Sequence, residues 1–114
     1  MKKKVLALFK RTKGLQIRVP APDDVWQYFE KHPQLIETTK ALLELASERL
    51  PDASLSLEIS RDPEEDEEYV VLYARFHRYD ETTMKRIRNV REEFLSNLGG
   101  EEEWPLLTTD FRSP

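Results

Sequence analysis

Residues 54–60 read Ser-Leu-Ser-Leu-Glu-Ile-Ser, a strict alternation of polar and apolar side chains. A period of two places Leu55, Leu57 and Ile59 on one face of an extended strand. A second alternating run, residues 69–79, follows after an eight-residue acidic loop. The apolar face of this second run is expected to carry Val70, Leu72, Ala74 and Phe76. Two alternating strands with one connecting loop predict a long antiparallel hairpin.

Helical patterns lie on both sides of this hairpin. Pro22 suits a first helical position, and Pro33 must stop or kink that helix near His32 because proline has no N–H. A longer amphipathic helix is expected from about 33 to 50, ending at a Pro-Asp pair. A third is expected over 80–98, between an aspartate that can cap its start and two glycines.

The two ends of the chain carry shorter strand signals. Runs 5–10 and 15–19 are separated by a four-residue connection that contains Gly14, which favours a hairpin. Residues 106–109 could add a last strand within the C-terminal tail 99–114, which is apolar enough to dock on the domain.

The order β-β-α-β-β-α, with this optional last strand, predicts a single α+β domain over residues 1–114. A two-layer sandwich with a mainly antiparallel sheet and two helices on one face would bury every apolar stripe. If the first strand is left out and the tail strand included, the order becomes β-α-β-β-α-β, the ferredoxin-like arrangement. The sequence leaves open whether the basic hairpin 1–14 is ordered.

Composition excludes several classes of protein. The chain has no cysteine, which rules out disulfides, a thiol nucleophile and cysteine-ligated metals. No apolar run approaches the ~18 residues that span a bilayer. The apolar run after the first lysines, Val5–Phe9, is too short for a signal peptide. We therefore expect a cytoplasmic protein that contacts no membrane and holds no cofactor.

Catalytic and metal-binding signatures are also missing. The sequence contains no HExxH, Walker A, GxGxxG or GxSxG motif. His32 and His77 lack the neighbouring ligands or nucleophile that a metal or catalytic site needs. The acidic loop has acids at alternate positions, as a calcium loop does, but Glu67 stands where the turn glycine is required. We expect neither an enzyme nor a metal site.

Charge is distributed unevenly along the chain and raises the possibility of nucleic-acid binding. The net charge is -4, yet residues 1–20 contain seven basic residues and no acid. Basic and aromatic residues also interleave over 73–79, a combination that can hold phosphates and stack bases. The candidate nucleic-acid-binding residues are Lys10, Arg11, Lys13, Arg18, Arg75, His77, Arg78, Lys85, Arg86 and Arg88. Against this function, the pI is about 5.3, whereas dedicated nucleic-acid-binding domains usually exceed ~9.

An uncovered sheet face with aromatic residues favours a protein interface instead. The candidate interface residues are Val71, Tyr73, Tyr79, Arg91, Trp104, Leu107 and Phe111. Arg91 falls inside the apolar stripe of the last helix. There its guanidinium either pairs with a carboxylate of a partner or extends into water while the aliphatic part of the side chain is buried. The favoured interpretation is a small protein-binding or accessory module, a homodimer or bound to a partner. Binding of RNA or DNA is the alternative.

Overall fold

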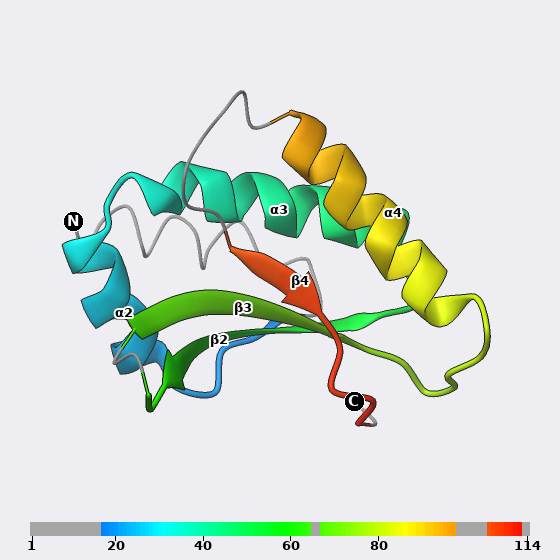
Figure 1. Cartoon of the computed structure of the whole chain (residues 1–114), viewed down its shortest axis with the longest axis horizontal. Coiled ribbons are helices and arrows are strands. Elements are labelled where there is room, and N and C mark those ends of the chain that lie inside the picture. The colour runs from blue at the N-terminus through cyan, green and yellow to red at the C-terminus, as the bar shows by residue number, and fades with distance from the viewer. Residues whose placement is uncertain (1–16, 65–66, 98–104, 113–114) are drawn as a thin grey trace.

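A computed structural model of the chain describes residues 17–64, 67–97 and 105–112, which contain three helices and a four-stranded sheet (Figure 1). In chain order the elements are β1 (Ile17–Arg18), α2 (Pro22–Lys31), α3 (Leu35–Arg49), β2 (Ser54–Asp62), β3 (Glu67–Arg75), α4 (Thr83–Ser96) and β4 (Leu106–Thr108). The last strand expected in the tail is therefore present. The strand expected at 5–10 and the hairpin 1–14 lie outside the described residues.

Local chemistry explains where the helices begin and end. Pro22 occupies the first turn of α2, and the helix ends at His32, whose N–H donates to the carbonyl of Tyr28 at 2.9 Å. Pro33 then separates α2 from α3, as the sequence predicts. Before α4, the Asp80 carboxylate accepts a 2.8 Å hydrogen bond from the N–H of Thr82, so its side chain shapes the turn that leads into the helix.

The sheet is mixed, so the prediction of a mainly antiparallel sheet is wrong. Its strands are ordered β1-β2-β3-β4, with β1 parallel to β2, β2 antiparallel to β3, and β3 parallel to β4. Helices connect the strands of each parallel pair and carry the chain back across the sheet, as parallel pairing requires. Because each such pair is directly adjacent, the sheet also lacks the interleaved strand order of the ferredoxin-like arrangement.

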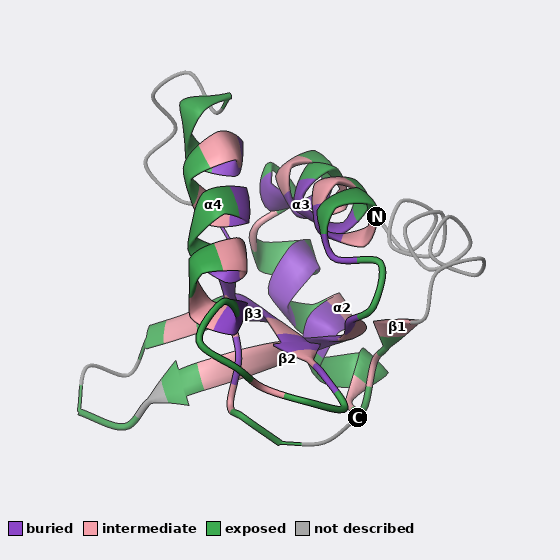
Figure 2. Ribbon diagram, turned by 90° about the vertical axis from the view of Figure 1, so that its right-hand side faces the viewer, coloured by how far each residue is buried: buried purple, intermediate pink, exposed green. Residues whose placement is uncertain are grey.

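Three helices, rather than the two predicted, lie on one face of the sheet and enclose the core with it (Figures 1 and 2). Leu57 pairs in register with Leu72, and Leu72 with Leu107, so three buried leucines cross the sheet on the helix-covered face. Phe29 and Ile87, which are fully buried, pack onto this layer from α2 and α4. The predicted core faces of β2 and β3 are thus confirmed.

The hairpin that joins β2 and β3 extends sideways past the helices (Figure 2). Its strands pair over nine residues, from Ser54↔Arg75 to Asp62↔Glu67, so the acidic end of the hairpin lies farthest from Arg75. Among the described residues, no helix combines the length and the apolar character that crossing a bilayer demands.

Candidate functional site

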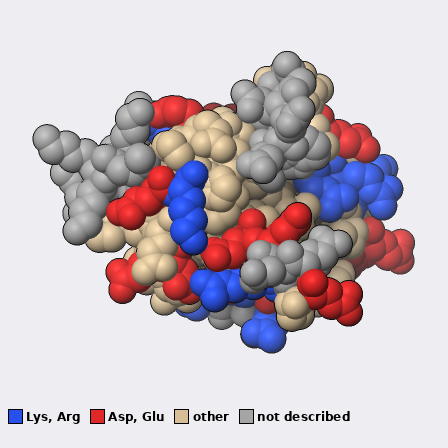
Figure 3. Space-filling view, turned by 60° about the vertical axis from the view of Figure 1, so that its left-hand side comes forward, with Lys and Arg blue, Asp and Glu red and all other residues tan. Residues whose placement is uncertain are grey.

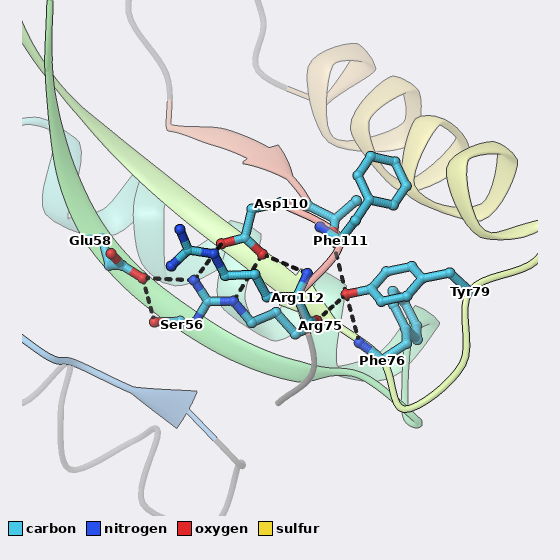
Figure 4. A network of polar contacts seen from close by, with 9 residues as sticks. Ser56, Glu58, Arg75, Phe76, Tyr79, Asp110, Phe111 and Arg112 are labelled. Atoms are coloured by element: carbon cyan, nitrogen blue, oxygen red, sulfur yellow. Dashed lines mark hydrogen bonds and ion pairs between the residues drawn. The ribbon is translucent and has the colours of Figure 1, made fainter.

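The segment 105–112 is tied to the sheet by a cluster of ion pairs around Arg75 (Figure 4). The Arg75 Nε donates to Asp110 Oδ1 at 3.1 Å, and its Nη2 donates to Asp110 Oδ2 at 2.8 Å. The same Nη2 reaches Glu58 Oε2 at 3.3 Å. These hydrogen bonds hold the pKa of Asp110 below its ordinary value, because the guanidinium stabilises the charged carboxylate. The Arg75 side chain is only 14% exposed and its charge is balanced by two acids.

Tyr79 provides a second attachment for the tail. Its hydroxyl accepts a hydrogen bond from the N–H of Phe76 at 3.1 Å and donates to the carbonyl of Arg112 at 2.6 Å. The Thr109 hydroxyl lies 3.3 Å from the same oxygen. One phenol therefore connects the loop after β3 with the last described residues.

Phe111 has an unusual backbone conformation. It is the non-glycine residue with positive φ, 59°, in the described part of the chain. Its N–H donates to Thr109 Oγ1 at 3.2 Å, and its ring contacts that of Tyr79 with centroids 5.4 Å apart. Figure 4 shows the ring on the α4 side of the tail, turned away from Arg75. The contacts hold the ring in place, yet 61% of the residue is exposed.

A groove runs between the C-terminal half of α4 and the start of β4. It has a volume of about 180 Å³ and is lined by Arg91, Phe94, Leu95, Pro105, Leu106 and Leu107. Leu107 is buried and belongs to the core, whereas Leu95 and Leu106 are 43% and 37% exposed. We call this feature the α4–β4 groove.

Three of the four large apolar residues that are exposed in the described ranges lie along one edge of the molecule, Leu95, Leu106 and Phe111, and the fourth is Tyr69 on β3. In the described ranges, β4 pairs with β3 on one side and with no strand on the other. The α4–β4 groove lies at the start of this strand, and the Phe111 ring follows its end. We call the edge formed by Arg91, Leu95, Pro105, Leu106 and Phe111 the β4-edge surface.

The structure places the predicted interface residues in three groups. Val71 lies on the uncovered sheet face but is buried, and Tyr73 beside it is half-buried under the guanidinium of Arg75, 5.2 Å from its ring. Arg91 and Leu107 line the α4–β4 groove at the start of β4, whereas Phe111 follows the end of that strand and packs on half-buried Tyr79. Trp104 lies outside the described residues.

Two of the predicted nucleic-acid-binding residues are held in ion pairs. Arg75 is paired as described above, and Arg86 donates to Asp52 from Nη1 at 3.0 Å. The other described candidates are exposed: Arg18, His77, Arg78, Lys85 and Arg88. Lys10, Arg11 and Lys13 lie outside the described residues. On the face drawn in Figure 3, acidic side chains are interspersed with the basic ones.

Sequence reasoning missed Leu95 and Leu106 as site residues. The helical period assigns Leu95 to the buried stripe of α4. The sequence does not show which strand the tail pairs with, so the exposure of Leu106 cannot be judged from it. The register supplies the missing information, because Leu106 pairs with Val71 on the face opposite the core. No sequence signal indicates the positive φ of Phe111.

Metal ligands and related proteins are two further sources of evidence on function. Within 17–64, 67–97 and 105–112, no three His, Cys, Asp or Glu side chains gather as metal ligands. Comparison with known proteins finds no matching family model, no matching curated protein and no matching solved structure.

Proposed function

We propose that this chain is a non-catalytic protein-binding module that acts through the β4-edge surface. The observation that carries the proposal is Phe111, an aromatic residue fixed in a left-handed conformation while 61% of it remains exposed. Positive φ is rare for bulky residues and persists only where surrounding contacts impose it. Strained residues of this kind cluster at ligand clamps and other functional positions.

The physical chemistry of interfaces supports this assignment. Aromatic residues and arginine dominate the energetic centres of protein interfaces, particularly when they fill apolar pockets. The β4-edge surface supplies an aromatic ring at Phe111 and, at the other end of β4, an apolar groove lined by Leu95 and the Arg91 side chain. A side chain that is already fixed loses little conformational entropy on binding, which strengthens the contact.

The charge arrangement favours a protein partner over a nucleic acid. Phosphate binding needs cations whose charge is available. The central arginine of the uncovered sheet face, Arg75, is bound by Asp110 and Glu58, and Arg86 is bound by Asp52. The uncovered face therefore presents balanced charge at the position where stacked bases would need a free cation.

Site-specific photo-crosslinking tests the proposal. A benzophenone amino acid would replace Phe111 in cells that produce the chain, and a matched variant would carry it at exposed Gln27 on α2. We expect a product of discrete mass from position 111 that is absent from position 27. Identical product patterns from the two positions would contradict a binding role for the β4 edge.

A further inference from the structure

We infer that the partner of the β4-edge surface is a second copy of this chain, with Phe111 of each copy seated in the α4–β4 groove of the other. This inference rests on the proposed function and names the partner of the same surface. A two-fold interface must be self-complementary, so that any projecting group on one copy meets a matching recess on the other. The β4 edge carries one of each.

The projecting ring and the groove lie at opposite ends of the same strand. Pro105 precedes the first residue of β4, and Phe111 follows the last residue, Thr108, by three positions. Figure 4 shows the Phe111 ring on the α4 side of the tail, and the groove lies between α4 and β4. A two-fold axis perpendicular to β4 exchanges the ends of the strand, so it brings each Phe111 to the groove of the other copy.

The groove has the size and lining for one phenyl ring. Its volume is about 180 Å³. An apolar cavity of about 150 Å³ lined by similar side chains binds benzene. Phe94, Leu95, Pro105 and Leu107 provide the apolar walls.

Arg91 supplies electrostatic complementarity in the groove. Its side chain is half-buried and forms no ion pair with any residue in the described ranges. A guanidinium attracts the negative face of an aromatic ring, and this attraction needs no carboxylate. The Phe111 ring of a second copy, seated in the groove, would lie beside this guanidinium.

The available area fits a reversible dimer. Each copy would bury the exposed parts of Leu95, Leu106 and Phe111 together with the outer edge of β4. Aromatic side chains present roughly 200 Å² each and leucines somewhat less, so these partly exposed side chains would bury about 500 Å² over the two copies, apart from the strand edge itself. This area belongs to weak, transient complexes rather than obligate dimers.

Sedimentation equilibrium of the purified full chain over a concentration series provides the test. The variants are Phe111→Ala, which removes the ring, and Leu95→Arg, which replaces an apolar wall of the groove with a longer side chain that occupies the space for the ring. Both residues are exposed, and circular dichroism would verify that each variant is folded. Tyr69→Ser is the matched control, because Tyr69 is 39% exposed but lies on the uncovered face of β3.

We expect the native chain and the Tyr69→Ser variant to dimerise alike, and each β4-edge variant to raise the dissociation constant at least about tenfold. Mixing Phe111→Ala with Leu95→Arg should restore association in part. The first variant keeps the groove and the second keeps the ring, so the mixed pair regains one of two contacts.

Two results would overturn the inference. A native chain that stays monomeric at about 1 mM, where even a weak dimer forms, excludes a second copy as the partner. A dimer that Phe111→Ala leaves intact shows that copies associate elsewhere. In either case a crosslink from position 111 to a different protein would still support the proposed function, so the two failures are distinguishable.

Discussion

Phe111 is held in its unfavourable backbone conformation by its immediate neighbours. The Thr109 hydroxyl accepts its N–H, and the Asp110 carboxylate accepts the N–H of Arg112 at 3.2 Å, so the residues on both sides are fixed. A left-handed conformation costs an L-residue about 1–2 kcal/mol. The bonds of the tail must therefore offset this cost.

Comparison of Phe111→Gly with Phe111→Ala isolates the backbone cost. Both variants lose the ring, but glycine adopts positive φ without steric penalty and alanine does not. We expect the glycine variant to have the higher free energy of unfolding, by about 1 kcal/mol, in urea denaturation. Equal stability of the two variants would show that φ at position 111 is not positive in solution.

Asp110 makes the stability of the fold depend on pH. Its pKa is lowered in the folded state by hydrogen bonds from Arg75, so the carboxylate stabilises the fold above its unfolded pKa of about 3.9. This contribution is lost as the pH falls below about 4. The Asp110→Asn variant should be less stable than the native chain at neutral pH, and the difference should shrink in acid.

Urea denaturation at neutral pH and near pH 3 measures that difference. Glu92→Gln, at an exposed position on α4, serves as the control for removing an acid elsewhere. If the gap between the native chain and Asp110→Asn were the same at both pH values, the Arg75–Asp110 pair would not contribute in the way its geometry indicates.

Thr39 is a buried residue whose hydroxyl has no hydrogen-bond partner among the described residues. An unsatisfied buried hydroxyl costs free energy, while valine has nearly the same shape without it. Thr39→Val should raise the free energy of unfolding by about 1 kcal/mol in urea denaturation. Thr39→Ser, which keeps the hydroxyl and loses the methyl group, should lower it.

At the scale of elements, the period of the side chains predicted where strands lie and which face is buried, but it did not predict the directions of the strands. The alternation at 54–60 located β2 and its buried face, and Pro33 marked the boundary between α2 and α3. The period of a strand is the same in both directions, so it could not show that β1 runs parallel to β2. Only two residues of β1 pair, which leaves little pattern to read.

The candidate site was harder to predict because it depends on contacts between distant segments. Arg91 and Phe111 were recognised from their residue types, but Leu95 and Leu106 were not. Their exposure depends on how β4 packs beside α4, and the local sequence pattern of either element gives no information about that packing. The pairing of Arg75 with Asp110 joins residues 35 positions apart and is equally invisible in the sequence.

Tyr79 should control how firmly β4 is attached to the sheet. Tyr79→Phe keeps the ring contacts and removes the hydroxyl that bonds Phe76, Arg112 and Thr109. We expect the free energy of unfolding to fall by about 1–2 kcal/mol. Backbone amide exchange should accelerate in 106–112 more than in 54–62, and equal changes in both segments would argue against a local role.

At the scale of the whole molecule, the two edges of the sheet differ in the side chains that they expose. The β1 edge has two paired residues and exposed Arg18, whereas the β4 edge has an apolar groove and an exposed ring. Short or charged edge strands are a common protection against unwanted pairing. Among the described residues, the exposed apolar side chains at the sheet edges therefore lie on the β4 side.

The hairpin between β2 and β3 has a further consequence for behaviour at high concentration. A sheet with one bare face can stack layer upon layer into fibrils. Here the end of the hairpin carries six acids within residues 62–68, and copies stacked in register would bring these carboxylates together. Their mutual repulsion opposes such stacking, so the acidic end of the hairpin should reduce aggregation of the protein at high concentration.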